Sequence, residues 1–534
     1  MRRRANVLIL MLMVAAVAVW NAGGNANSEH SSKTTFMSDV SSKAENAPEG
    51  VLLLYDSLAH RTPREGNVDM IQRLLASMGK EVKLQALDRY QQGEMSTFGA
   101  VIVIRNLPGL SRDDNEFIAD LLSFDGFYLH IGDEPPRTLQ AALQANIHVA
   151  SPARAQISLG SIRQADLSDQ TEAIPYFKQV SGKKHGEMTI SGQTNIVPYG
   201  ASQGKYAYVP YLGKGLAAEL SIAFVLREWL GKEGNGRLAL VFHEIYPFTD
   251  LKLLEKVADE LYGAGIPFVY SIRPIFHNTD YPAMKRYLEV LKYAQSRNGT
   301  IFVNAPVVSP VAGIQETKLD EKMASFINLL AENGIAPLGI GADSEQFWRN
   351  ERGIVQEGMG FFSTSVLFKG QSVLSQTEAQ TARAFPFSML SADRKSVFEL
   401  FGTEEKLAPL PLHLAIAISF PEDAEQWREE FQSLKQSWLV FDDMKNGWHR
   451  TATSAHGIES RGGILYIDEN VVSLTHSAHD VSTDYEYREK EKESFKWLFT
   501  VQNYFYLAVI GVSLLLFSVL LLFGYRLYKQ KYMK

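Results

Sequence analysis

The order strand, helix, strand between residues 238 and 272 constrains the fold of this chain more than any other feature. Leu238–Phe242 is an apolar run typical of a strand buried on both faces. The amphipathic run Leu251–Tyr262 follows, and either Thr249 or Asp250 is suited to cap its first turn. A second apolar run, Phe268–Ile272, comes next. This order predicts a βαβ unit, in which ligand chemistry collects beyond the carboxyl ends of the strands.

The same alternation continues to about residue 470. Further apolar runs predict strands at Thr300–Val303, Pro337–Ile340, Gly360–Leu367, Leu412–Ile418 and Trp438–Phe441, with a last one at Gly463–Ile467. Helical patterns separate most of these runs, so residues 236–470 are expected to form a distorted parallel barrel of six to eight strands, of the (β/α)7 type.

Residues 50–150 predict a separate α/β domain that is flavodoxin-like or amidotransferase-like. Its first strand, Val51–Tyr55, is followed by no glycine-rich fingerprint, and the chain has no cysteine to serve as an amidotransferase nucleophile. Asp56 and Asp133 follow two of the strands, where they either bind a ligand or organise turns. Residues 151–235 predict a β-rich region followed by one helix, Leu216–Leu230.

Both ends of the chain carry membrane signals. Three arginines and the apolar run Val7–Trp20 predict a signal peptide over residues 1–27; an uncleaved N-terminal anchor is the alternative. A linker over residues 28–49 follows. Near the other end, a charged stalk (471–499) precedes an uncharged stretch, 504–523, long enough to cross a bilayer. The tail 524–534 is basic, which predicts a cytoplasmic C-terminus and an extracellular body on a single-pass membrane protein.

Composition excludes several classes of function. The absence of cysteine rules out disulfides, thiolate metal sites and cysteine nucleophiles. A net charge of −7 and a pI near 6.0 give no electrostatic case for nucleic acid.

Three stretches carry a resemblance to a known family: Leu240–Thr249, Leu261–Pro274 and the spacing from there to Gly299–Val303. They resemble the uncharacterised, membrane-anchored bacterial branch of the NodB-type polysaccharide deacetylases. The resemblance implies a distorted (β/α)7 barrel and a carbohydrate deacetylase, a hydrolase of amide C–N bonds that uses a divalent metal such as zinc.

Both catalytic motifs of that family are changed here. Where the family has two adjacent acids, one a general base and one a metal ligand, this chain has His243 and Glu244. Where the family has histidines, this chain reads VNAPVVSP over Val303–Pro310, and Asn304 is the nearest polar group. His243 and Glu244 are therefore the candidate catalytic and metal-binding residues, and Asp442-Asp443 is the best replacement pair of acids.

Further residues at strand ends are candidates for substrate binding or, alternatively, for capping helices and ordering loops. The polar candidates are Arg273, Asn304 and Asp343, and the aromatic candidates for stacking on sugar rings are Tyr246, Phe276 and Trp348.

Three functions stay open at this point. The first is a deacetylase-like pseudoenzyme that binds a polysaccharide, either an exopolysaccharide or a cell-wall glycan, or assists exopolysaccharide assembly proteins. The second is an active, metal-dependent polysaccharide de-N-acetylase. The third is a structural partner in a membrane complex.

Overall fold

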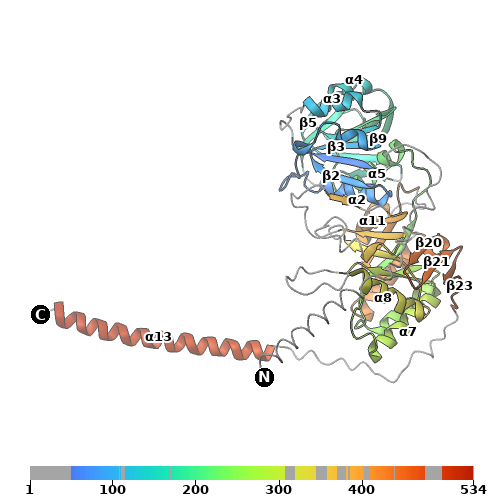
Figure 1. Cartoon of the computed structure of the whole chain (residues 1–534). Helices are drawn as coiled ribbons and strands as arrows, with labels where there is room; N and C mark the ends of the chain where they lie inside the picture. The colour runs from blue at the N-terminus through green and yellow to red at the C-terminus, as the bar shows by residue number, and fades with distance from the viewer. Residues whose placement is uncertain are drawn as a thin grey trace, which may run out of the picture.

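A computed structural model of the chain describes residues 50–107, 109, 115–160, 162–168, 171–306, 319–343, 358–369, 380–382, 385–401, 409–437, 439–474 and 496–532. Figure 1 shows an N-terminal α/β unit stacked on a unit built around a barrel. The candidate Trp348, the expected signal peptide and most of the expected stalk lie outside the described residues.

The N-terminal unit is organised by five parallel strands. They are β1 (Val51–Tyr55), β2 (Val82–Ala86), β3 (Ala100–Arg105), β4 (Phe127–Gly132) and β11 (Tyr206–Val209), in the spatial order β2-β1-β3-β4-β11. Every residue of β1 is buried, as its apolar sequence requires. This is the strand order of flavodoxin-like doubly wound sheets.

The same sheet continues beyond β11 with antiparallel strands. These are β10 (Val197–Gln203), β9 (Lys183–Ile190), β6 (Ala155–Leu159) and β7 (Ile162–Asp166). A separate two-stranded sheet pairs β5 (Asn146–Ala153) with β8 (Glu172–Gln179). Because β11 returns to lie beside β4, residues 50–150 and 151–235 share one sheet across the boundary expected near residue 150.

Helices cover this sheet, and a buried ion pair joins two of them. The helices are α2 (Asn67–Ser77), α3 (Asn115–Ser123), α4 (Arg137–Leu143) and α5 (Gly215–Trp229), with short 3-10 turns η1 (Leu87–Arg89) and η2 (Glu94–Thr97). Arg73 Nη2 on α2 lies 2.8 Å from Glu219 Oε1 on α5, and both side chains are buried. Each charge needs the other there, since an unpaired buried charge is strongly destabilising.

The second unit contains a closed barrel of seven parallel strands, as the sequence predicts. The strands are β12 (Leu238–Ile245), β13 (Phe268–Ile272), β14 (Gly299–Asn304), β15 (Pro337–Asp343), β16 (Thr364–Phe368), β18 (Phe387–Asp393) and β19 (Leu414–Ser419). The helices between them are α6 (Leu251–Gly263), α7 (Pro282–Ser296), α8 (Leu319–Glu332), α11 (Arg394–Phe401) and α12 (Ala424–Gln436). Asp250 caps α6 by accepting from the backbone N–H of Lys252 and of Leu253 at 2.9 and 3.2 Å.

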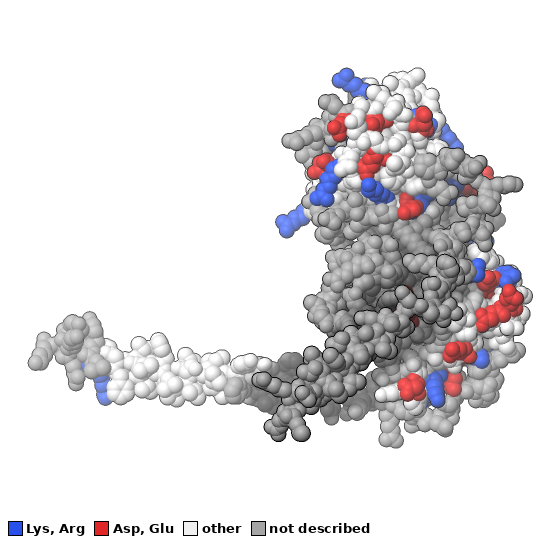
Figure 2. Space-filling view, in the orientation of Figure 1, with Lys and Arg blue, Asp and Glu red and all other residues white. Residues whose placement is uncertain are grey.

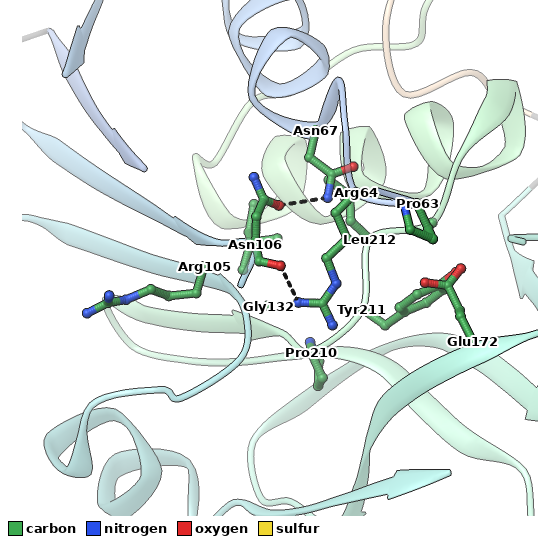
Figure 3. Close-up of a pocket in the computed structure, with 12 residues that line it drawn as sticks. Pro63, Arg64, Asn67, Arg105, Asn106, Gly132, Glu172, Pro210, Tyr211 and Leu212 are labelled. Atoms are coloured by element: carbon green, nitrogen blue, oxygen red, sulfur yellow. Dashed lines mark hydrogen bonds between the residues drawn. The ribbon is translucent and has the colours of Figure 1, made fainter. Parts of the chain in front are cut away.

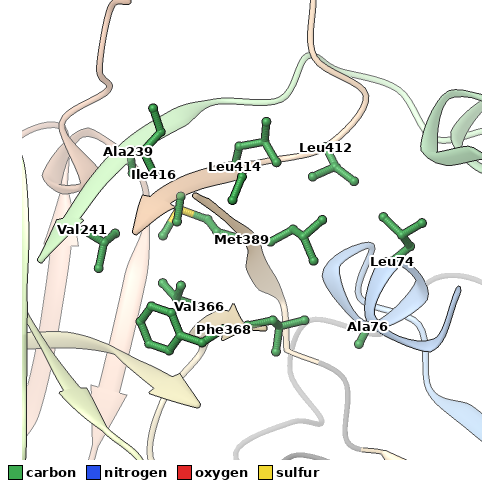
Figure 4. Close-up of a cluster of buried hydrophobic side chains, with 14 of the residues drawn as sticks. Leu74, Ala76, Ala239, Val241, Val366, Phe368, Met389, Leu412, Leu414 and Ile416 are labelled. Carbon is green, nitrogen blue, oxygen red and sulfur yellow. The ribbon is translucent and has the colours of Figure 1, made fainter. Parts of the chain in front are cut away.

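The N-terminal unit packs against the amino-terminal end of the barrel. Leu74 and Ala76 of α2 face Leu412 and Met389, which lie at or near the starts of the last two barrel strands (Figure 4). A short strand from the barrel unit, β17 (Gln380–Ala382), also pairs antiparallel with β2 at the edge of the N-terminal sheet. Side chains of both units therefore form one continuous core.

A C-terminal antiparallel sheet also lies at this end of the barrel. Its strands are β20 (His449–Ala452), β21 (Gly457–Arg461), β22 (Ile464–Ile467) and β23 (Asn470–Val471), preceded by the turn η3 (Met444–Asn446). Thr364 Oγ1, at the start of β16, lies 2.6 Å from His449 Nδ1. Because added structure covers the amino-terminal end, the carboxyl end of the barrel is the end left for a ligand.

Two predicted barrel strands are wrong, and one barrel strand was not predicted. Gly463–Ile467 contains β22, which belongs to the C-terminal antiparallel sheet and not to the barrel. Residues 439–443 form no strand. Asp442 donates its N–H to the carbonyl of Leu238, the first residue of β12, and Asp443 caps η3. Asp442 and Asp443 therefore lie at the amino-terminal end of the barrel and cannot replace catalytic acids at the other end. The sequence analysis missed β18, whose apolar pattern is broken by Ser388 and Ser391.

The C-terminal helix α13 (Lys496–Tyr532) is long and apolar enough to span a membrane. The candidate span, Tyr506–Arg526, has 21 residues and a mean hydropathy of 2.7, and none of it is buried against the rest of the protein. In Figure 2 the middle of α13 is a continuous uncharged surface, with basic side chains toward its C-terminal end. The prediction of an apolar helix over residues 504–523 is confirmed at the level of length and composition.

Candidate functional site

The carboxyl ends of the barrel strands bring together the polar candidates of the sequence analysis. His243 and Glu244 lie near the end of β12, and Arg273 directly follows β13. Asn304 is the last residue of β14, and Asp343 is the last residue of β15. Because the strands are parallel and adjacent, these ends meet at one rim, which we call the barrel mouth.

A β-bulge sets the directions of His243 and Glu244. The pairing of β12 with β13 shifts between Phe242 and Ile245, and Glu244 has a left-handed φ of 63°. That conformation costs a non-glycine residue about 1–2 kcal/mol. Adjacent residues on a regular strand point to opposite faces, whereas a bulge re-aims side chains, often beside active sites. Strain at this position is consistent with a functional constraint on Glu244.

The imidazole of His243 lies inside the rim and is largely buried. Its ring centroid is 5.2 Å from that of Phe368 on β16. Burial lowers the pKa of His243 below 6.5, Arg273 lowers it further, and Glu244 and Asp343 oppose that shift. At neutral pH His243 is therefore an uncharged ring that can donate one hydrogen bond and accept another. These effects on the pKa indicate that the charges of Glu244, Asp343 and Arg273 lie near this ring.

Arg273 is held in place by its backbone more firmly than by its guanidinium group. Its N–H donates to the carbonyl of Ile245 at 2.9 Å. The guanidinium contacts are longer: Nη1 lies 3.5 Å from the carbonyl oxygen of Ala305, and Nη2 lies 3.7 Å from Glu244 Oε1. Contacts of this length leave much of the donor capacity of a guanidinium unused. Arg273 thus places a positive charge at the barrel mouth, and this charge is only loosely paired with the carboxylate of Glu244.

Asn304 lies deeper and forms part of the floor of the mouth. Its side chain is buried, and its Oδ1 accepts a hydrogen bond from Ser271 Oγ. A Cβ placed on Gly341 would come within 2.5 Å of the Phe368 ring and within 2.9 Å of both Asn304 Oδ1 and Ser271 Oγ. The packing around Gly341 therefore fixes Asn304, and only a small part of this residue is open to a ligand.

A stacked aromatic pair stands on the loop that follows β12. The rings of Tyr246 and Phe248 lie 4.7 Å apart with an interplanar angle of 17°, and Phe248 is 72% exposed. Thr249 orders this loop, since its Oγ1 accepts from the N–H of Tyr246 at 3.0 Å. Sequence analysis named Tyr246 but missed Phe248, although two aromatics spaced by one residue in a strand-end loop were a usable signal. Phe276 is half-buried against the core and is less available.

The donor set at the mouth does not fit a hydrolytic metal centre. Such a centre needs about three protein ligands and an open position. Among the residues that the structure describes, no group of three histidine or carboxylate side chains gathers closely enough to hold a metal ion. The charges of Glu244 and Asp343 influence the pKa of His243, but the three side chains do not converge on one point. Together they do not make the ligand set of a catalytic metal.

A second concave site lies in the N-terminal unit (Figure 3), but it is small. It is lined by Arg64, Asn67, Asn106, Glu172 and Tyr211 among others, and has room for about one or two water molecules. The two acids expected near it are engaged internally. Asp56 accepts from the N–H groups of Asn106 and Leu107, and Asp133 pairs with Arg64. These contacts organise loops at the strand ends.

Comparison with known proteins yields only distant likenesses. No protein-family model and no curated protein matches the chain. Among solved structures, the peptidoglycan N-acetylglucosamine deacetylase Bc1960 is 12% identical with a TM-score of 0.26, and the match covers 40% of this chain and 88% of that one.

Two other solved structures are similarly remote. A beta-arabinopyranosidase is 12% identical over 46% of this chain and 39% of its own, with a TM-score of 0.20. A truncated 3-deoxy-D-arabino-heptulosonate 7-phosphate synthase from Thermotoga maritima is 12% identical over 40% of this chain and 96% of its own, also with a TM-score of 0.20. Likenesses this weak carry no argument about what this chain does.

Proposed function

We propose that this protein is a membrane-anchored, deacetylase-like protein of the cell surface that binds polysaccharide at the barrel mouth. One observation carries the proposal: the Tyr246–Phe248 stack, with Phe248 exposed, follows the strand end that holds Glu244, and Glu244 and Arg273 are only loosely paired with each other. The resemblance of Leu240–Thr249 to NodB-type deacetylases supports the choice of a glycan as ligand.

The chemistry of a sugar suits this combination of groups. A pyranose ring has an apolar face, which stacks on an aromatic ring, and an edge of hydroxyl or amide groups, which needs donors and acceptors. At the mouth, Arg273 supplies donors, and Glu244 and Asp343 supply acceptors. Neutral His243 supplies one of each. A neutral polyol is favoured over an anion because two carboxylates outnumber one guanidinium among these groups.

The proposal is a binding role rather than catalysis. Deacetylation by the route that the family resemblance implies requires a metal-bound water, and the described residues at the mouth do not supply the ligands. The active de-N-acetylase remains the runner-up. It is distinguished by stoichiometric divalent metal in the purified protein together with release of acetate from N-acetylated oligosaccharides.

The membrane placement belongs to the same proposal. With α13 in the bilayer and the basic residues after Phe523 on the cytoplasmic side, the barrel lies outside the cell. There it would meet exopolysaccharide or cell-wall glycan, and exopolysaccharide assembly proteins in the same membrane are its expected partners. Protease added to intact cells should remove the body and leave a short membrane-bound fragment; full protection would contradict this placement.

The binding proposal is tested with two single variants, Glu244→Ala and Arg273→Ala, in the full-length protein in detergent micelles. Both should weaken binding of glucosamine- and N-acetylglucosamine-containing oligosaccharides by about tenfold, the effect of losing one charge-assisted hydrogen bond. The melting temperature should stay within about 2 °C of the parent, because both side chains are partly exposed and only loosely paired.

Matched controls come from an exposed charge pair on the surface of a barrel helix, which has no contact with the candidate residues of the mouth among the described interactions. Lys395 and Glu399 form a loose pair, 3.8 Å apart, on an exposed face of α11. Lys395→Ala and Glu399→Ala should change neither glycan binding nor stability. A fall of several degrees in melting temperature for both mouth variants, with binding reduced only in proportion to folded protein, would make those residues structural and defeat the proposal.

A further inference from the structure

A serine, a histidine and a glutamate form a connected chain in the N-terminal unit, far from the barrel mouth. Ser202 Oγ on β10 lies 2.7 Å from His185 Nε2 on β9. On the other side of the same ring, His185 Nδ1 lies 2.6 Å from Glu228 Oε2 on α5. Figure 1 shows α5 beside β9. The chain around this serine reads Gly200-Ala201-Ser202-Gln203-Gly204, a G-x-S-x-G pattern that the sequence analysis did not use. It lies where β10 turns into the next strand, and not in the strand-to-helix turn of a nucleophile elbow.

The sheet register explains why the three side chains meet. Strands β9 and β10 are antiparallel, with Ser202 opposite Lys183 and Gly200 opposite His185. Side chains two residues apart on a strand share a face, so Lys183, His185 and Ser202 point the same way. Helix α5 packs against β9 and brings Glu228 to that face.

The acid fixes the tautomer of the imidazole. A carboxylate accepts hydrogen bonds and donates none, so Nδ1 carries the proton that Glu228 Oε2 accepts. Nε2 is then left as an acceptor for the hydroxyl proton of Ser202. Burial lowers the pKa of His185 to about 4, with Lys183 acting in the same direction, so the ring is neutral at pH 7. This is the protonation state in which histidine serves as a general base.

Exposure differs sharply along this chain of residues. His185 is buried at 3% exposure, whereas Ser202 is partly open to solvent, and Gln203 and Gly204 after it are exposed. If Glu228 only held α5 against the β9–β10 hairpin, its contact with His185 or with Lys183 would be enough, and the Ser202 hydroxyl would not be needed. The Ser202 hydroxyl is a potential nucleophile near the surface, and the buried imidazole of His185 beside it can act as its base. This is the arrangement of an activated serine.

We propose that Ser202, His185 and Glu228 form a second site that hydrolyses carboxylic esters with a small acyl group, such as acetyl esters of a large alcohol. Ser202 Oγ bonds to the ester carbonyl carbon while its proton moves to His185 Nε2. The carbon–oxygen bond to the alcohol then breaks, and the leaving oxygen takes that proton. Water attacks the acyl-serine in the same manner, and the free acid and Ser202 result.

The remaining groups fit the roles that this reaction needs. Lys183 lies directly across the sheet from Ser202, and its ammonium group pairs with Glu228. It is therefore the cation placed to stabilise the negative oxygen of the tetrahedral intermediate. Glu228 acts through the imidazole and is a positioning residue. A large alcohol can remain in solvent over Gln203 and Gly204, which is why the proposal specifies a small acyl group.

The test uses full-length protein in detergent micelles, a fluorophosphonate probe that reacts only with activated serines, and p-nitrophenyl acetate. We expect the probe to label Ser202, as located by mass spectrometry, and ester hydrolysis to be saturable. Ser202→Ala should abolish labelling, and Ser202→Cys should restore hydrolysis in part. Glu228→Gln should lower kcat by about 10²–10⁴-fold with KM nearly unchanged, because it disturbs only the base.

Ser181 provides the matched control, since its hydroxyl donates to Gln144 and has no histidine partner. Ser181→Ala should label and hydrolyse like the parent. The melting temperature of each variant separates loss of activity from loss of fold. Folded parent protein that is not labelled would overturn the proposal, and so would a label that persists in Ser202→Ala. An unchanged kcat in Glu228→Gln would show that the acid merely ties α5 to the hairpin.

Discussion

The imidazole of His243 and the ring of Phe368 face each other across the interior of the barrel, 5.2 Å apart at an angle of 42°. Their strands, β12 and β16, are not neighbours in the barrel, so this contact spans its lumen. The Phe368 ring therefore packs against the imidazole from the opposite wall of the barrel. The geometry of the proposed glycan site therefore depends on packing beneath it.

Gly341→Ala should disturb that packing. The new methyl group would lie 2.5 Å from Phe368 and 2.9 Å from Asn304, which is too close for either side chain to stay in place. Overpacking of this kind costs about 1–3 kcal/mol. Thermal unfolding should show a lower melting temperature. Glycan binding should also fall, because the ring of Phe368 packs against His243 and a shift of Phe368 would displace the imidazole.

Gly263→Ala is the control for this substitution. Gly263 ends α6, and no atom lies within 4 Å of the position of a Cβ there. Its melting temperature should be unchanged or slightly higher, since alanine favours a helix over glycine. Equal melting temperatures for the two variants would contradict the close packing of Phe368 and Asn304 around Gly341.

Glu244→Gly separates strain from ligand binding at the bulge. Glycine adopts a φ of 63° without the steric cost that glutamate bears, so this variant should be as stable as the parent or more so. It also removes one acceptor of the mouth, and glycan affinity should fall. A variant that is both less stable and unaltered in binding would show that the Glu244 carboxylate serves the fold alone.

One buried and one partly buried histidine at the amino-terminal end of the barrel predict a loss of stability in acid. Burial lowers the pKa of both His413 and His449 to about 4, from an unfolded value of 6.5. Between these values the unfolded chain binds more protons than the folded one, so stability is full above pH 6.5 and falls as the pH drops toward 4. Each group contributes on the order of 3 kcal/mol to this loss.

Denaturant unfolding between pH 7 and pH 4 measures this effect, and His449→Gln isolates one contribution. Glutamine keeps a polar partner for Thr364 but does not titrate, so the dependence of unfolding free energy on pH should become shallower. The groups facing these rings are Arg237, whose backbone N–H donates to His413 Nδ1, and the ring of Phe387. An identical pH profile in the variant would rule out this origin of acid sensitivity.

Local pattern predicted the elements where the apolar run was unbroken. The strands Val51–Tyr55 and Phe268–Ile272 have the predicted bounds, and Asp250 caps α6 as the sequence indicated. Strand β18 was missed because serines interrupt its apolar pattern. The strand predicted at Trp438–Phe441 was wrong because residues 439–441, although apolar, form a loop. Long-range pairing, such as β11 beside β4 or β17 on β2, leaves no local signal.

The same limit applies to the sites. Strand ends located His243, Glu244, Arg273, Asn304 and Asp343 at one rim, because parallel strands bring their carboxyl ends together. Sequence could not show that Asn304 lies in the floor, that a bulge re-aims Glu244, or that Asp442 lies at the opposite end of the barrel. The contact of His185 with Ser202 and Glu228 joins two strands and a helix and follows only from the sheet register.

Calorimetric titration of the full-length protein in micelles with oligosaccharides of glucosamine and N-acetylglucosamine tests the central claim most directly, when parent and Phe248→Ala are compared. Phe248 is 72% exposed, so its loss should leave the melting temperature unchanged. Loss of one stacking face should weaken binding by about 1–2 kcal/mol, roughly five- to thirtyfold. Equal affinity in the two proteins, or no binding by a folded parent, would contradict a glycan site at the barrel mouth.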